Sequence, residues 1–270
     1  MRDSLVDSLV LYGRYLALSL RSQLQYRAAL VMQIIGQLLV TGIEFLAIWA
    51  LFARFGSLGG WTMPEIGLMY GMVDVSFAVA DAMGRGFDAF GTMVKNGDFD
   101  RVLLRPRSTA LQLLGQELTL KRVGRLAQGL VVLAWAGHVA VDWSVGRALL
   151  LVFALAGAAC LFLGIEVLEA TTAFWTVESL EVWNAFSYGG NYAAQYPMSI
   201  YRTWFRRFFT AVIPLSCVIY LPAVEILGRS DPAGLPPVLH ALGPGAGVAF
   251  LLVSLSLWRL GVRHYTSTGS

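Results

Sequence analysis

Several carboxylates and amides stand inside strongly apolar stretches of this chain, where they could bind a proton or a cation, or line a polar path. An ionised carboxylate at the middle of a membrane costs roughly 2.5–3.5 kcal/mol on insertion scales, so such groups should face other protein or water. The candidate pathway or interface residues are Gln37, Glu44, Asp74, Asp81, Glu166 and Glu169.

Their spacing puts each group on one face of a helix. The positions that share a face are Gln33, Gln37, Thr41 and Glu44 in one segment, Asp74 and Asp81 in the next, and Glu166 and Glu169 in a third. Two interpretations stay open: a translocation path or proton-sensitive site, and hydrogen bonding between helices or to a second subunit. No Lys or Arg is expected at the depth of Asp74 to neutralise it.

An enzyme is disfavoured, because the chain has no HExxH motif, no GxSxG elbow, no clustered Cys and His, and no Walker A motif. Cys160 and Cys217 lie in apolar segments and are interpreted as small buried hydrophobes. We therefore expect no cofactor on this chain, and any energy for work must come from a partner or an ion gradient.

The composition points to lipid as the solvent. Of the 270 residues, 57% are hydrophobic and 14% are charged, against about 25% charged in soluble domains. The net charge of +3 does not indicate a nucleic-acid partner, because the basic residues flank apolar segments instead of forming a soluble domain. Membrane lipid is the partner that this pattern favours.

The pattern predicts an all-α integral membrane protein, a single domain over residues 1–270. Residues 4–25 read as an amphipathic helix lying in the membrane interface. Six spans follow, since about 20 residues cross the hydrocarbon. They are expected at about 28–53, 65–86, 123–140, 147–174, 205–227 and 243–260. Val238 to Leu242 is expected to form a short helix that returns partway into the membrane.

The basic residues set the orientation. On these spans, seventeen of the twenty Lys and Arg residues fall on one side, and only Arg54, Arg147 and Arg229 on the other. Cytoplasmic loops retain Lys and Arg, so both termini are expected in the cytoplasm. Residues 176–204, rich in Trp and Tyr, are then expected to lie along the inner leaflet.

The loop between spans two and three contains a second candidate site. Phe99, Val102 and Leu103 form a small apolar stripe on a short helix that ends at Pro106, with Arg101 beside it. Such a helix at the inner membrane face suits docking into a groove on another protein. The alternative is that it simply lies on lipid headgroups.

The stretch Gly97-Asp-Phe-Asp-Arg-Val-Leu-Leu-Arg-Pro106 resembles the cytoplasmic motif of a bacterial family of type-2 ATP-binding-cassette (ABC) permeases. Supporting pieces are Phe174-Trp175, Tyr196-Pro-Met-Ser-Ile-Tyr201, Val212-Ile-Pro214 and Tyr220-Leu-Pro-Ala223. The resemblance implies a six-helix exporter permease in the bacterial cytoplasmic (inner) membrane. It would pair with a second permease, identical or paralogous, and with two ABC ATPases that hold the ATP and Mg.

The resemblance also implies which residues couple to the ATPase. These are Asp98, Phe99, Arg101, Leu103, Leu104, Arg105 and Pro106. Arg107-Ser108-Thr109 departs from the apolar start expected for the next helix. Two other hypotheses remain: an ion-coupled secondary transporter that uses the intramembrane carboxylates, and a membrane enzyme or scaffold.

Overall fold

The computed structural model describes residues 5–116, 120–176, 180–230 and 236–266, and in these ranges the chain forms helices and no strand. The long helices are α1 (Leu5–Gln25), α2 (Arg27–Phe55), α3 (Met63–Asp88), α7 (Val123–Ala140), α8 (Val145–Thr172), α9 (Leu180–Ala194) and α13 (Gly245–His264). The shorter ones are α4 (Phe90–Lys95), α5 (Phe99–Leu103), α6 (Thr109–Leu114), α10 (Thr203–Ala211), α11 (Leu221–Ile226) and α12 (Pro237–Leu242). Single turns are η1 (Leu120–Arg122) and η2 (Met198–Ile200), and η3 (Ser216–Tyr220) is a π-helix.

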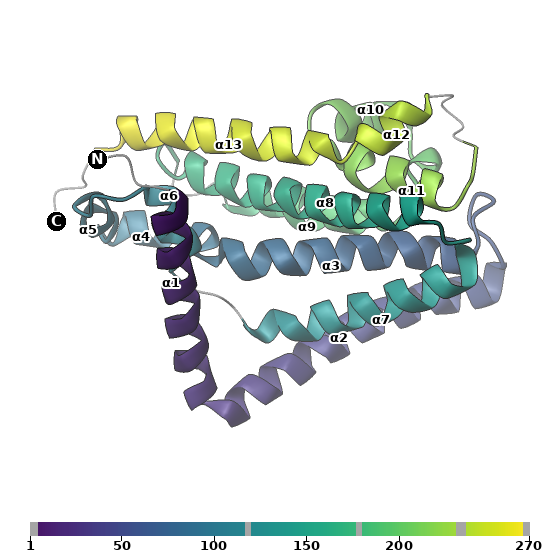
Figure 1. Ribbon diagram of the computed structural model, residues 1–270, viewed down its shortest axis with the longest axis horizontal. Coiled ribbons are helices and arrows are strands. Elements are labelled where there is room, and N and C mark those ends of the chain that lie inside the picture. Colours follow the sequence, from purple (N-terminus) through teal and green to yellow (C-terminus); the bar gives the residue numbers. More distant parts are fainter. Residues whose placement is uncertain (1–4, 117–119, 177–179, 231–235, 267–270) are drawn as a thin grey trace.

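Five helical stretches in these ranges are long and apolar enough to cross a membrane: Arg27–Phe55, Met63–Lys95, Leu120–Ala140, Val145–Thr172 and Gly245–His264. Their bundle has two ends. The α5 end holds α4, α5, α6 and the last turn of α13; the far end holds residues 56–62 and 141–144 (Figure 1). The all-α membrane fold predicted from the sequence is confirmed.

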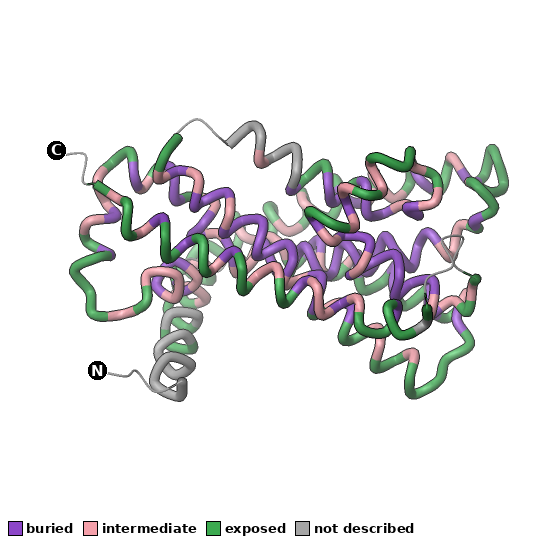
Figure 2. The backbone as a smooth tube through the Cα atoms, turned by 90° about the horizontal axis from the view of Figure 1, so that it is seen from above, coloured by how far each residue is buried: buried purple, intermediate pink, exposed green. Residues whose placement is uncertain are grey.

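The core lies around α3, which packs against α7, α8 and α9 and is buried along most of its length (Figures 1 and 2). Local sequence begins this helix firmly, because Thr62 and Glu65 form a capping box, with Thr62 N donating to Glu65 Oε2 at 2.7 Å. Glycines let the neighbours approach: a Cβ on Gly71 would lie 2.8 Å from Leu133 of α7. Close contact through small residues is how helices associate in lipid.

Helix α1 stands at a steep angle to the long helices at the α5 end (Figure 1). It contacts α2 and α6, and Gln23 Oε1 accepts a hydrogen bond from Leu120 N at 2.9 Å. This placement is the one expected of an interfacial helix. Residue 4, the first of the predicted helix, and the side chains of Leu5, Leu9, Tyr12 and Leu16, which make most of its apolar stripe, lie outside the described part.

The predicted fifth span, 205–227, is not one continuous helix. Its residues form two helical pieces, Thr203–Ala211 and Ser216–Ile226, bent by 83° at a break. Pro214 explains the break, because proline lacks an N–H and disfavours helical backbone in the residue before it.

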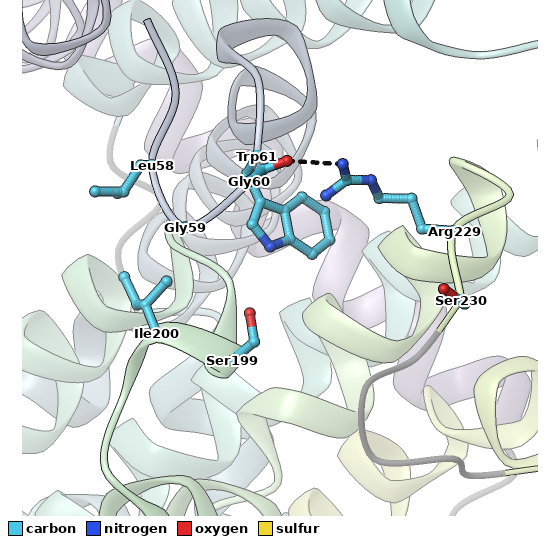
Figure 3. Close-up of a pocket in the computed structure, with 8 residues that line it drawn as sticks. All are labelled: Leu58, Gly59, Gly60, Trp61, Ser199, Ile200, Arg229 and Ser230. Carbon is cyan, nitrogen blue, oxygen red and sulfur yellow. Dashed lines mark hydrogen bonds between the residues drawn. The ribbon is translucent and has the colours of Figure 1, made fainter. Parts of the chain in front are cut away.

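Both ends of this bent segment lie at the far end of the bundle. A Cβ on Gly59 would lie 3.1 Å from Ile200 Cγ2, and Arg229 Nη2 donates to Gly60 O at 2.8 Å. Figure 3 shows Ser199 and Ile200 on one side of the Gly59–Trp61 loop and Arg229 on the other. The guanidinium of Arg229 also lies 4.4 Å from the Trp61 ring centroid, so it fixes the loop to the chain after α11. Residues 200–229 therefore enter and leave the bundle by the same end.

Helix α9 runs beside α8 from the α5 end toward the far end of the bundle (Figure 1). Trp183, near its start, shares an apolar pocket with Thr172 and His264 at the α5 end, whereas Ile200 lies at the far end. The expectation that residues 176–204 lie along one leaflet is therefore wrong, although residues 177–179 are outside the described part. The predicted short helix at Val238 to Leu242 is present as α12.

This path changes the charge count. Arg202, Arg206 and Arg207 lie at the far end instead of the α5 end, and Arg2 is outside the described residues. Thirteen of the described basic residues therefore lie on the α5 side. The excess of Lys and Arg still favours the α5 side, but it is smaller than the sequence predicts.

Candidate functional site

A segment of three short helices, α4 to α6, caps the α5 end of the bundle (Figure 1). Gly97, with φ of 72°, makes the turn between α4 and α5, a left-handed conformation that glycine adopts without strain. Helix α5 then presents one face to the protein and one to the outside.

The inner face of α5 is held by an aromatic cluster. Its members are Phe87, Phe90, Phe99, Phe174, Trp258 and Tyr265. Phe99 is fully buried among them, with ring centroids 4.9 Å from Phe90, 5.1 Å from Tyr265 and 5.7 Å from Phe174. Edge-to-face aromatic pairs contribute about 0.5–1.5 kcal/mol each beyond area burial. The cluster therefore fixes α5 to the ends of α3, α8 and α13.

Polar groups at the cluster strengthen the same connection. Trp258 Nε1 of α13 donates to Thr109 Oγ1 of α6 at 3.0 Å. Partial burial, and then the neighbouring Asp100 carboxylate, raise the pKa of the Tyr265 phenol above its ordinary value. The segment is thus hydrogen-bonded to α13 through Trp258 and lies against the Tyr265 ring that follows this helix.

The outer face of α5 is small and mixed in character. Leu104 is 85% exposed and Leu103 is 40% exposed, and the Arg101 side chain, which pairs with Asp98 at 3.5 Å, is 82% exposed. Arg105 and Pro106 are also exposed. We call Arg101, Leu103, Leu104, Arg105 and Pro106 the α5 tip.

The apolar stripe predicted to dock on a partner, Phe99, Val102 and Leu103, is only partly exposed. The sequence pattern predicts that Phe99 and Val102 contact a partner protein, but both side chains are buried against the rest of this chain. Leu103 is the exposed residue of that stripe. The apolar surface that a partner could contact therefore consists of Leu103 and Leu104 instead of Phe99 and Val102. A five-residue helix does not specify which of its apolar faces is covered until neighbouring helices are in place.

The interior of the bundle contains the predicted carboxylates. Asp74 of α3 is fully buried, and its Oδ1 accepts hydrogen bonds from Arg125 of α7, from Nε at 3.0 Å and from Nη2 at 2.7 Å. The guanidinium also lies 4.6 Å from the Phe77 ring centroid. The expectation that no base would reach Asp74 is therefore wrong. Gly129 lies against Asp74, and the long Arg125 side chain reaches it from one turn earlier in α7.

Asp81, two turns further along α3, has a similar partner. It forms an ion pair with Arg122, and the two side chains are 8% and 13% exposed. Arg122 Nη1 also donates to Gln37 Oε1 of α2 at 3.4 Å. Polar groups from α2, α3 and η1 thus meet in one layer near the α5 end.

A third polar layer lies nearer the far end. Gln128 Nε2 donates to Tyr70 Oη at 3.1 Å and to Thr41 O at 2.7 Å. Glu44 Oε1 accepts from Tyr192 Oη of α9 at 2.9 Å, while Oε2 of Glu44 is buried without a hydrogen-bond partner in the described part of the chain. Glu44 is thus the predicted residue that joins α2 to α9.

Glu166 and Glu169 of α8 are different, because no ion pair reaches them from the described residues. They are 8% and 7% exposed, and Glu166 Oε2 and Glu169 Oε1 lack hydrogen-bond partners there. Gly84 makes room for Glu166, since a Cβ on it would lie 1.4 Å from Glu166 Oε2. Among the described residues, no group of three or more His, Cys, Asp or Glu side chains is arranged to hold a metal ion.

Sequence reasoning missed the α7 side of this network. Arg122, Arg125 and Gln128 are spaced i, i+3 and i+6, which places them on one helix face. That spacing was a usable signal. The two arginines stand at the start of the predicted span, where basic side chains ordinarily contact lipid headgroups, so the spacing alone does not distinguish a buried network from an interface.

The family model of the ABC-2 family transporter proteins matches residues 38–269. Neither the curated proteins nor the solved structures gave a match. The matched residues contain the α5 tip, the aromatic cluster and every one of the six predicted interior residues except Gln37, which directly precedes them. The chain is therefore a transport permease and belongs to the ABC-2 family of transporter proteins.

Proposed function

We propose that this permease is the membrane subunit of an ATP-driven exporter, and that a separate ABC ATPase docks on the α5 tip. The carrying observation is that a tip with exposed Leu103 and Leu104, flanked by Arg101 and Arg105, is fixed to the membrane helices by the aromatic cluster. In such an assembly ATP and Mg would be held by the two partner ATPases, and this chain would hold no cofactor.

The chemistry of the tip defines what it would dock into. Leu104 has most of its surface free, so an apolar groove would bury it, at about 25 cal/mol per Å² of apolar surface removed from water. The exposed guanidinium of Arg101 favours acidic residues on the rim of that groove. We expect each ATPase to offer an apolar groove with a negative rim.

The aromatic cluster would carry movement of the tip into the bundle. Phe99 contacts Phe90 of α4, Phe174 after α8, and Tyr265 after α13. When ATP binding moves the docked ATPases, α5 would therefore pull on α8 and α13 together. Helix α2, which contacts α1, α7 and η1 and bonds to Tyr192 of α9 through Glu44, has no contact with the aromatic cluster among the described residues and would follow less directly.

A second permease, identical or paralogous, would cover the surface where α2 meets α9. Tyr188 and Tyr192 are 41% and 47% exposed there, beside Glu44. Ionisable groups at membrane depth face protein or water rather than lipid. We infer that this surface lies between the two permeases and borders the route of the exported molecule.

The orientation follows from charge. Thirteen of the described basic residues lie on the α5 side, so that side would be cytoplasmic in the bacterial inner membrane, with both termini there. This places the tip where ATPases are found.

The test is Leu104→Glu in the complex co-expressed with its ATPase. We expect the ATPase to be lost on purification through a tag on the permease, with ATP-dependent transport falling at least tenfold. Lys95→Glu is the matched control, because Lys95 is exposed on α4 at the same end but outside the tip. If Leu104→Glu keeps the ATPase and transports normally, docking occurs elsewhere.

An ion-coupled secondary transporter is the second candidate, and one observation favours it. Glu166 and Glu169 are buried without an ion pair from the described residues, as a proton-binding site requires. Proton-driven transport by this chain alone in liposomes, abolished by Glu166→Gln, would establish that function. ATP-dependent transport that survives Glu166→Gln would remove this carboxylate from the mechanism.

A further inference from the structure

A polar pocket of about 430 Å³ lies at the corner where α1 meets α2, closed on its other side by the end of α3 and by η1. Its walls include the cations Arg85 and Lys121 and the polar side chains of Ser22, Tyr26 and Gln33. This pocket is separate from the α5 tip and from the buried ion pairs.

The two cations differ in what neutralises them. Arg85 forms an ion pair with Asp88, one turn further on in α3. Lys121 is half-buried and has no ion-pair partner in the described part of the chain. A half-buried ammonium beside a second cation favours an anion in the pocket.

The position of the pocket indicates which class of anion it would bind. Helix α1 lies across the α5 end of the bundle, so the α1–α2 corner is at the membrane surface (Figure 1). Helix α2 continues past the pocket as an apolar span, and its other faces expose Val31, Met32 and Ile35, at 52%, 75% and 52%. A cationic pocket beside the exposed apolar surface of a membrane span fits a molecule with a charged head and apolar chains.

We propose that this pocket binds the phosphate headgroup of an anionic phospholipid of the adjacent leaflet, whose acyl chains lie along α2. Lys121 and Arg85 would face the phosphate, and the hydroxyl and amide groups of Ser22 and Gln33 would donate to its oxygens or to the glycerol. The lipid would brace α1 against η1, where Gln23 Oε1 already accepts from Leu120 N.

The proposal is independent of the exporter assignment. Residues Ser22 to Gln33 precede the segment matched by the family model, which begins at residue 38. The site requires only that the chain is in a bilayer, so its failure would leave the proposed function standing, and failure of that function would leave the site.

The experiment compares lipids of equal chain length by native mass spectrometry of the full-length complex. Wild type should bind phosphatidylglycerol roughly thirtyfold more tightly than phosphatidylcholine, since two cations near the surface contribute about 1 kcal/mol each. Lys121→Gln should weaken phosphatidylglycerol binding about fivefold, and Lys121→Arg should restore it. Lys95→Gln is the matched control, because Lys95 is the other lysine of the chain and is exposed at the same end.

Three outcomes would overturn the proposal. Equal affinity for the two lipids would remove the headgroup charge from recognition. Equal effects of Lys121→Gln and Lys95→Gln would make the attraction a general one between membrane and protein. Displacement of phosphatidylglycerol from wild type by about 10 mM inorganic phosphate would identify a site for free phosphate instead of lipid.

Discussion

Replacing Asp74 by Asn should destabilise the permease strongly, because it leaves the Arg125 guanidinium buried without its counter-ion. The Arg125 side chain is 6% exposed and Asp74 is fully buried, so water cannot take the place of the carboxylate. Two charged hydrogen bonds to Oδ1, at 3.0 and 2.7 Å, are lost or weakened. Removing one partner of a buried ion pair costs about 3–5 kcal/mol, and the contact with Phe77 offsets only part of that.

A double substitution separates fold from function at this pair. Asp74→Leu with Arg125→Met replaces both charges by apolar groups, which is often neutral or stabilising by about 1–4 kcal/mol. We therefore expect the double variant to be within about 1 kcal/mol of wild type or above it, and Asp74→Asn to be well below. Asp142→Asn, at an exposed carboxylate in the far-end loop, is the matched control and should be close to neutral.

The assay is reversible unfolding of the purified protein in detergent, followed by tryptophan fluorescence, with transport measured on the folded variants. A loss of less than about 1 kcal/mol for Asp74→Asn, or a double variant as unstable as the single one, would refute the ion-pair argument. Transport that survives in the double variant identifies the pair as structural. Transport lost in a stable double variant would instead place Asp74 in the pathway.

Two further predictions concern packing at the α5 side. Gly84→Ala should displace the Glu166 side chain, because the new Cβ would lie 1.4 Å from Glu166 Oε2. We expect the midpoint of thermal unfolding to fall by several degrees. Gly91→Ala is the control and should leave this midpoint unchanged, because no atom lies within 4 Å of the added Cβ. Phe99→Ala should cost about 3–5 kcal/mol of unfolding free energy by opening the aromatic cluster, whereas Leu104→Ala at the tip should change it by less than about 0.5 kcal/mol. Equal losses for the latter two would show that Phe99 does not anchor α5.

Local signals were enough for the helices whose apolar runs are uninterrupted. The predicted spans at 28–53, 65–86, 123–140, 147–174 and 243–260 overlap α2, α3, α7, α8 and α13 closely. Each is long, apolar and bounded by clear signals, such as the capping box at Thr62 and Glu65. The prediction from sequence was least accurate at residues 176–227. Helix α9 is short there, and Pro214 divides the apolar run that follows, so the length of an apolar run does not show whether the chain crosses the bundle or turns back.

The candidate sites show the same contrast between local sequence signals and tertiary packing. The loop motif located α5, but which of Phe99 and Leu104 faces outward depends on α8 and α13, which arrive from distant parts of the chain. Likewise, the helical spacing of Asp74 and Asp81 was visible, while their pairing with Arg125 and Arg122 required α7 to pack on α3.

By itself, the sequence determined the solvent, the helical class, the excess of basic residues on one side and the transporter family, because these depend on composition, on periodicity and on one contiguous motif. Only the tertiary structure decided which carboxylates are neutralised, which face of α5 is free, where residues 200–229 turn back, and that Lys121 and Arg85 share a pocket with the start of α2. Each of these is a contact between residues far apart in the chain, and such contacts exist only once helices have packed side by side and the protein, not lipid, surrounds the polar groups.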